Sequence, residues 1–205
     1  MIRTLETRNI TPMIILVSNS WLRKTIMEAS KLQFITEGAD LDERALEQQH
    51  QDKTDEEVAI ILASAKAKLI QRKNHDAVVI AADTFALLPS GERLHKPANP
   101  EEAVELCLAQ SGKTIKVVTG IVMAYKGKTI TNTTVTDITY MAFDRSAIEH
   151  LLENDDATIR NSGLGFFSDA PGFTLVESFN GSYTGAMGLP MEIVWQNLKA
   201  FNYAE

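Results

Sequence analysis

The chain has 205 residues, which at roughly 150 residues per domain predicts one domain, or one domain with two lobes. Its 44% hydrophobic and 23% charged residues are ordinary for a globular protein and exclude both disorder and a fibrous repeat. A formal net charge of −7 excludes the basic footprint of a duplex-binding protein, although a few convergent Lys and Arg side chains can still form a local anion pocket.

The single cysteine, Cys107, excludes an internal disulfide and a cysteine-based zinc site. It lies in an apolar helical pattern, and we interpret it as a small core residue. No apolar run approaches the ~18 residues of a membrane span. The apolar stretch 13–17 is also too short for the apolar part of a signal peptide. We therefore expect a cytoplasmic protein that does not contact a membrane.

The first elements predict a strand followed directly by a helix. Residues 1–12 lack periodicity and indicate an extension before a single domain over 13–205. The continuous apolar run 13–17 is typical of a buried strand, and the polar turn 18–20 leads into a helix predicted over 21–32. A strand, a polar turn and a helix N-terminus form a phosphate-binding geometry. The glycines of the known phosphate-binding motifs are missing here.

The middle of the chain alternates a helix, a strand and a second helix. Thr54 and Glu57 form a capping box at the start of the first helix. The apolar run 77–82 predicts a buried strand that continues directly into Asp83. Asn99, followed by proline, caps the next helix.

The last third favours antiparallel strands. Residues 114–125 and 129–143 are rich in β-branched and aromatic side chains, and the turn 126–128 between them predicts a hairpin. A short helix from Asp144, a strand over 173–177 and a final helix launched by 188–190 complete the chain. Early alternation followed by antiparallel strands predicts an α/β fold with a mixed twisted sheet flanked by helices.

Asp83 is the first candidate for chemistry. A carboxylate just past the carboxyl end of a buried strand lies where open α/β sheets place their ligand crevice. There it can hold a hard cation or orient a water. The simpler alternative is that Asp83 caps the turn that follows.

Lys66 is unusual because it lies on the apolar stripe of its helix, four residues after Leu62 and three before Leu69. Such a lysine either snorkels at the edge of the core, which is the commoner case, or offers its ammonium group to an anion in a cleft. Lys96 directly precedes a proline and a capped helix, and a surface loop is the default interpretation for it.

The first turn of the predicted helix over 21–32 carries Arg23 and Lys24, which oppose the helix dipole unless an anion joins them. Ser18 and Ser20 precede them, and capping or phosphate contact is the role expected of these hydroxyls. The acidic residues Asp40, Asp42 and Glu43 indicate either a solvated loop or a magnesium-binding carboxylate. The four histidines have no metal-ligand spacing and receive no role.

Taken together, these positions resemble the Maf family of nucleoside triphosphate pyrophosphatases, which is related in fold to the inosine triphosphatases. The similarity runs from about residue 13 to the carboxyl end. It rests on ordered motifs: Ala-Ala-Asp-Thr at 81–84, Lys-Pro at 96–97, the Pro-Glu-Glu-Ala helix at 100–103, Ser-Gly at 111–112, Val-Thr-Gly at 118–120, Gly-Ser-Tyr at 181–183 and Gly-Leu-Pro at 188–190. The resemblance implies a single domain with two lobes around a central cleft.

The resemblance also implies roles by position. Asp83 matches the family's catalytic base and metal contact, and Lys66 and Lys96 match lysines that hold the triphosphate. Glu43 matches a carboxylate that helps to carry a divalent cation, magnesium or manganese. The substrate-binding set implied by the amino-terminal motif is Ser18, Ser20, Arg23 and Lys24.

Three positions tied to base selection depart from a single family branch. Leu22 stands where one branch has arginine and the other has tryptophan. Thr84 resembles the branch that acts on thymidine and uridine triphosphates. Asp169 stands where that branch has glutamine and the 7-methylguanosine triphosphate branch has glutamate. These markers leave the preferred base open.

The function implied is hydrolysis of a canonical or modified nucleoside triphosphate to a monophosphate and pyrophosphate. A homodimer is implied as well, with no nucleic-acid partner. One alternative is a nucleotide-binding regulator of septum formation and cell division without useful turnover, motivated by Trp21 and Leu22. Another is an acidic protein-interaction domain, against which the ordered set of Asp83, Lys66 and Lys96 argues.

Overall fold

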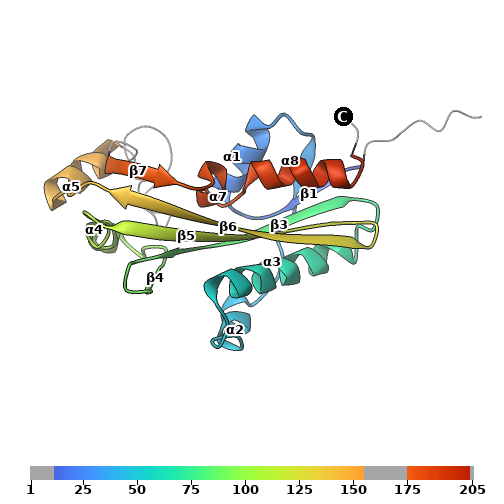
Figure 1. Cartoon of the computed structure of the whole chain (residues 1–205), viewed down its shortest axis with the longest axis horizontal. Helices are drawn as coiled ribbons and strands as arrows, with labels where there is room; N and C mark the ends of the chain where they lie inside the picture. The colour runs from blue at the N-terminus through green and yellow to red at the C-terminus, as the bar shows by residue number, and fades with distance from the viewer. Residues whose placement is uncertain (1–11, 155–174, 204–205) are drawn as a thin grey trace, which may run out of the picture.

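The computed structural model describes residues 12–154 and 175–203. Seven strands form one mixed sheet in the order β2-β1-β3-β5-β6-β7, and β4 pairs with β3 (Figure 1). The strands are β1 (Ile14–Val17), β2 (Phe34–Thr36), β3 (Val78–Leu87), β4 (Arg93–Leu94), β5 (Thr114–Tyr125), β6 (Lys128–Tyr140) and β7 (Val176–Asn180). The helices are α1 (Trp21–Ala29), α2 (Glu43–Gln48), α3 (Asp55–Gln71), α4 (Pro100–Leu108), α5 (Arg145–Asn154), α7 (Tyr183–Ala186) and α8 (Met191–Ala200).

Helices cover both faces of this sheet, with α2 and α3 on one face and α1 and α8 on the other (Figure 1). Successive side chains of β3 alternate between these faces. Val79 belongs to a buried group with Ala67 of α3. Its neighbour Ile80 belongs to a second group with Met27 of α1. The mixed sheet between helices confirms the expected fold class.

The predicted hairpin is present and makes the two longest strands. Its turn consists of Lys126 and Gly127, which have φ angles of 45° and 79°. Positive φ at both central residues suits the right-handed twist of a two-residue hairpin. The turn is one residue shorter than expected, because Lys128 already pairs with Tyr125.

Buried apolar side chains gather toward the two ends of these long strands. One end is built around β1, α1, α3 and α8. The other is built around the far halves of β5 and β6 together with α4 and α5. This division corresponds to the two expected lobes. In the part of the chain that the structure describes, no helix is long and apolar enough to span a membrane.

Several predicted boundaries shift. The first helix ends at Ala29, and Lys31 then adopts a left-handed backbone with φ of 65°. The acidic segment is not simply a loop, because α2 begins at Glu43 and Asp42 caps it by accepting a hydrogen bond from the Ala45 amide at 2.9 Å. The strand expected over 173–177 lies at Val176–Asn180, and residues 173 and 174 lie outside the described part.

Helix α3 lies unusually close to β5. A Cβ atom added at Gly120 would lie 2.6 Å from the backbone carbon of Ala59, which leaves no space for any side chain there. Gly120 pairs across the sheet with Asp83. The close approach therefore sets the distance between α3 and the part of β3 that carries Asp83.

Candidate active site

A short stretch of β3 has a strand on only one side. Strand β1 pairs with residues up to Ala81, and β4 pairs from Ala86 onward. Between them, residues 82–85 pair with β5 on one edge, and no described strand covers the other edge. We call this stretch the open edge. The chain leaves β1 toward Ser18 beside it.

The expectation that Asp83 follows the end of its own strand is wrong. Strand β3 continues to Leu87 because β5 and β4 go on pairing with it. Asp83 instead lies past the carboxyl end of the neighbouring strand β1, whose last paired residue is Val17. The crevice expected at a strand end therefore exists, but β1 makes it.

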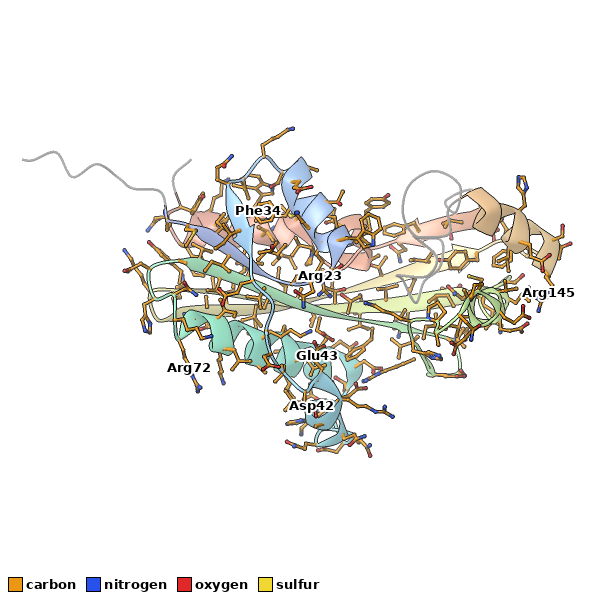
Figure 2. The ribbon with its side chains drawn as sticks, turned by 180° about the vertical axis from the view of Figure 1, so that it is seen from behind. Arg23, Phe34, Asp42, Glu43, Arg72 and Arg145 are labelled. Atoms are coloured by element: carbon orange, nitrogen blue, oxygen red, sulfur yellow. The ribbon has the colours of Figure 1, made fainter. Side chains whose placement is uncertain are left out.

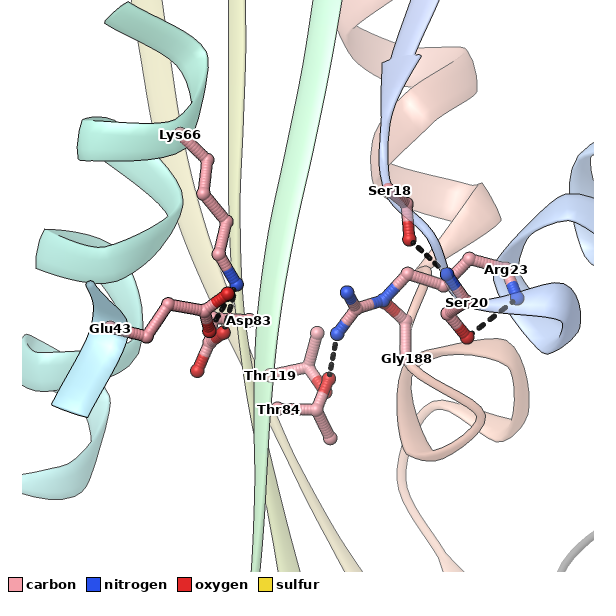
Figure 3. Close-up of polar contacts among 9 residues, drawn as sticks. All are labelled: Ser18, Ser20, Arg23, Glu43, Lys66, Asp83, Thr84, Thr119 and Gly188. Atoms are coloured by element: carbon pink, nitrogen blue, oxygen red, sulfur yellow. Dashed lines mark hydrogen bonds and ion pairs between the residues drawn. The ribbon is translucent and has the colours of Figure 1, made fainter. Parts of the chain in front are cut away.

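On one face of the open edge lies an ionic cluster of Glu43, Lys66 and Asp83 (Figure 3). The Lys66 ammonium donates to Asp83 Oδ1 at 2.6 Å and pairs with Glu43 Oε2 at 2.8 Å. Lys66 and Asp83 are each 7% exposed, whereas the Glu43 side chain is half exposed. Lys66 therefore does not snorkel to water but bridges two carboxylates.

Burial decides the electrostatics of Asp83. Removal from water raises the pKa of its carboxyl group, and the Lys66 ammonium and the Arg23 charge oppose that rise. The nearby Glu43 carboxylate adds to the rise. Asp83 is thus a stronger base than a solvated aspartate while remaining in contact with a cation.

On the opposite face, a hydrogen-bond relay runs from Arg23 through Thr84 and Thr119 (Figure 3). Arg23 Nε donates to the Gly188 carbonyl at 2.8 Å, and its Nη2 donates to Thr84 Oγ1 at 3.1 Å. The Thr119 hydroxyl donates to the Gly185 carbonyl at 2.8 Å. Its single proton is then used, so the 2.9 Å contact with Thr84 runs from Thr84 to Thr119. Each hydroxyl of the relay therefore donates its proton to one defined acceptor.

Arg23 is a half-buried cation whose hydrogen-bond acceptors in the described part of the chain are a carbonyl and a hydroxyl, both neutral. Burial lowers the pKa of its guanidinium, and the charges of Asp83 and Glu43 oppose that effect. Of the five N–H donors of an arginine, the relay and Gly188 use two. The remaining donors are available for an anion.

The two serines before α1 both accept backbone hydrogen bonds, and Ser20 is the N-cap of the helix. Ser20 Oγ accepts from the Arg23 amide at 3.4 Å, and Ser18 Oγ accepts from the Ser20 amide at 3.0 Å. These bonds fix the turn between β1 and α1 and so the direction of Arg23. Each hydroxyl proton is left to donate to another group.

The structure does not bring every predicted residue to the open edge. Lys24 is exposed and lies 3.8 Å from Glu28 on the surface of α1. Lys96 is exposed on the connection from β4 to α4, without an ion pair or hydrogen bond to any described residue. Leu22 packs against the buried group around β1, α1 and α8. Asp169 lies outside the described residues.

Sequence reasoning missed Thr119 and the part that Gly185 and Gly188 play. Thr119 is fully buried in an otherwise apolar stretch of β5, and a buried hydroxyl needs a partner. That was the available signal, but its partner Thr84 is identified only by the pairing of β3 with β5.

The ionic cluster also fits a hard divalent cation. Magnesium is commonly bound by one or two carboxylates together with substrate phosphates. Glu43 and Asp83 supply two carboxylates that already converge on one cation, the Lys66 ammonium. No group of three or more His, Cys, Asp or Glu side chains suited to a metal occurs among the described residues, so further ligands would come from a phosphate or water.

Most of this chain is similar in sequence to known proteins. Residues 13–201 match the family model described as "Maf-like protein". The 7-methyl-GTP pyrophosphatase of Brucella suis biovar 1 (strain 1330) is 33% identical over 184 residues, covering 88% of this chain and 92% of that protein. The dTTP/UTP pyrophosphatase of Chlorobium phaeovibrioides (strain DSM 265 / 1930) is 30% identical over 188 residues, covering 92% and 96%.

Among solved structures, the Staphylococcus aureus Ham1 protein aligns with 62% of this chain and 71% of its own, at 17% identity and a TM-score of 0.41.

Proposed function

The chain belongs to the Maf family, and from that premise we propose that it is a nucleoside triphosphate pyrophosphatase. It hydrolyses the bond between the α and β phosphates and releases a nucleoside monophosphate and pyrophosphate. The observation that carries this proposal is the open edge of β3, which has a buried carboxylate on one face and an arginine with free donors on the other.

Charge supports a divalent cation in the reaction. The two carboxylates and one ammonium of the ionic cluster sum to a formal charge of −1. A triphosphate with about four negative charges is repelled by such a cluster unless a cation is added. We propose that Glu43 and Asp83 hold magnesium or manganese, which when bound supplies positive charge to the phosphates.

The face of the open edge that carries the hydrogen-bond relay, here called the relay face, binds and orients the phosphates. Arg23 is fixed by two hydrogen bonds and directs its remaining donors to the triphosphate, as a planar guanidinium suits phosphate oxygens. Ser18 and Ser20 donate their free hydroxyl protons to the same group. Lys66 has a third ammonium proton beyond those used for its two carboxylates, and Lys96 is the remaining lysine of the proposed set.

Asp83 takes the proton from the attacking water. Its Oδ1 is bound to Lys66, so Oδ2 is the oxygen that accepts this proton. The water oxygen bonds to the α-phosphorus, the bond to the bridging oxygen breaks, and the electron pair leaves on pyrophosphate.

Pyrophosphate release from a panel of canonical and modified nucleoside triphosphates, including dTTP, UTP and 7-methyl-GTP, tests the proposal with magnesium or manganese present. Asp83→Asn should lower kcat by at least about a hundredfold, because a general base contributes that much or more. Nucleotide affinity, measured by calorimetry, should change far less. Asp137→Asn, on strand β6 outside the open edge, is the matched control and should leave kcat unchanged.

Unchanged turnover in Asp83→Asn would contradict the role of this residue. Nucleotide binding without pyrophosphate release by the unaltered protein would favour the regulator. Leu22, which motivated that alternative, packs against the buried apolar group around β1, α1 and α8, so its side chain has a structural role. The panel also identifies the preferred base, which Thr84 alone does not determine.

A further inference from the structure

Helix α2 presents Glu43 to the ionic cluster, yet none of its residues belongs to a buried apolar group of the described chain. It is six residues long and has no buried side chain. Helices this short are marginal in water without tertiary contacts. Glu43 is its first residue, so the position of this carboxylate depends on what attaches α2 to the remainder of the fold.

Arg93 of β4 makes that attachment through three elements. Its Nη1 donates to Glu47 Oε1 of α2 in a short ion pair. Its Nε and Nη2 donate to Asp55 Oδ1, the first residue of α3, at 2.8 and 2.5 Å. The guanidinium carbon lies 3.8 Å above the Phe85 ring of β3, a cation–π contact that fixes the plane of the group.

These contacts lie on the same side of the fold as the ionic cluster. Phe85 and Asp83 are two residues apart on β3, so their side chains share the face toward α3. Glu47 and Glu43 are four residues apart on α2, so they share one side of that helix. Helix α2 is therefore held at two points along one side, by Arg93 at Glu47 and by Lys66 at Glu43.

We infer that Arg93 is a positioning residue, which orients Glu43 for the cation and Lys66 by fixing α2; this rests on the proposed function. Without Arg93, the ion pair between Glu43 and Lys66 is the one that still joins α2 to another described element, and this is the contact that has to be oriented. A planar guanidinium can bind two carboxylates and stack on a ring at once, whereas a lysine ammonium cannot reproduce this arrangement.

Helix α3 does not depend on Arg93 for its own start. Its capping box is complete, because Thr54 Oγ1 accepts from the Glu57 amide at 3.3 Å and Glu57 Oε2 accepts from the Thr54 amide at 2.9 Å. Loss of Arg93 leaves Asp55 at a helix N-terminus, where a negative charge is favoured. The effect of removing Arg93 should therefore be confined largely to α2.

Arg93→Met, which retains an apolar chain over Phe85, tests the inference. We expect kcat to fall on the order of tenfold with little change in the nucleotide KM, as misplacement of a catalytic group predicts. In a Glu43→Gln background the same change should alter kcat by less than about twofold, because the two residues act as one unit. Arg145→Met is the matched control.

Arg145 resembles Arg93 in bridging carboxylates, here those of Glu101, Glu105 and Glu149, but it lies at one end of the molecule, away from Glu43 (Figure 2). Its loss should leave kcat unchanged. A second measurement is independent of turnover: backbone ¹⁵N order parameters over residues 43–48 should fall from about 0.85 toward 0.6 in Arg93→Met, but not in Arg145→Met. Order parameters of α3 should not change.

Unchanged order parameters of residues 43–48 in Arg93→Met would overturn the inference, whatever the variant's kcat. If Arg93→Met lowered kcat as much in the Glu43→Gln background as in the unaltered protein, the inference would also be overturned, because Arg93 would then act separately from Glu43. Absence of hydrolysis by the unaltered protein across the nucleotide panel contradicts the proposed function instead. In that case positioning of Glu43 for catalysis fails with it, and the order parameters still decide whether Arg93 holds α2.

Discussion

Two neighbouring residues of β3, Asp83 and Thr84, belong to opposite faces of the sheet and to opposite kinds of chemistry (Figure 3). The face toward α3 holds a cluster of three charged groups in direct contact. The face toward α1 and α8 holds a chain of neutral hydroxyls and carbonyls fixed to one arginine. In the mechanism that we propose, a single step along one strand thus separates proton transfer and cation binding from anion binding.

The two faces respond differently to damage. In a buried ion pair, loss of one partner leaves a charge without compensation, which costs about 3–5 kcal/mol. Loss of one hydroxyl from a hydrogen-bonded chain costs about 1 kcal/mol, or somewhat more where the partner is charged. The face with the charges is therefore the one more easily destabilised, and in the proposed mechanism it is also the face that carries the general base.

Lys66→Met should produce the largest effect because it removes the one cation among the described residues that contacts Asp83. Both side chains are 9% exposed, so solvent screens the interaction little. We expect the free energy of unfolding at neutral pH to fall by about 3 kcal/mol, measured by urea denaturation, together with loss of pyrophosphate release.

The double variant Lys66→Met/Asp83→Asn provides the control for this prediction. It removes both opposite charges, so it should be more stable than Lys66→Met alone. Equal stability of the single and double variants would show that the unpaired Asp83 charge is not what destabilises the single variant.

Gly120→Ala disturbs the charged face without altering a charge. The added Cβ would lie 2.6 Å from the Ala59 backbone, so α3 has to move away from β5 and carry Lys66 with it. We expect a loss of about 2 kcal/mol by urea denaturation, as for other overpacked sites.

Gly38→Ala is a useful control, because its added Cβ meets the Asn19 side-chain oxygen at 2.7 Å. The flexible end of a side chain can move where a helix backbone cannot, so the loss should stay below about 1 kcal/mol. Equal losses at both glycines would contradict the idea that α3 is fixed by close approach at Gly120.

Much of the charged face could be predicted from sequence. Lys66 interrupts an apolar helical stripe, and Asp83 ends an apolar run, so both violate local patterns that burial imposes. The hairpin and the capping box of α3 were equally local and were predicted closely. The length of β3 was not, because it depends on pairing with β4 and β5 rather than on its own residues.

The relay face was harder to predict for the same reason. Thr84 and Thr119 are 35 residues apart, and Arg23 and Gly188 are 165 apart, so only sheet register and helix packing bring them together. Arg93 offers no sequence signal of its own, since an arginine in a short polar segment between two predicted elements is ordinary. Its partners Glu47 and Asp55 lie about 40 residues upstream. Tertiary contacts of this kind produce no periodic pattern of residues in the sequence.

Thr84→Val should give the smallest effect, and it isolates the relay. Valine preserves the shape of threonine but can neither accept from Arg23 Nη2 nor donate to Thr119. Thr119 keeps its bond to the Gly185 carbonyl, so the loss of unfolding free energy should be only about 1 kcal/mol. Arg23 loses one of two anchors, and we therefore expect the nucleotide KM to rise several-fold while kcat changes little.

Thr114→Val is the matched control for this last prediction. It removes a threonine–threonine contact of the same length, 2.9 Å, between the same oxygen types, but on an exposed part of β5. Valine suits an exposed strand as well as threonine does, so stability and KM should both stay unchanged. A rise in KM in both variants would show that Arg23 does not depend on Thr84. A fall in kcat in Thr84→Val alone would instead show that the relay acts in the chemical step rather than in substrate orientation. Such a result would contradict the division of roles between the two faces.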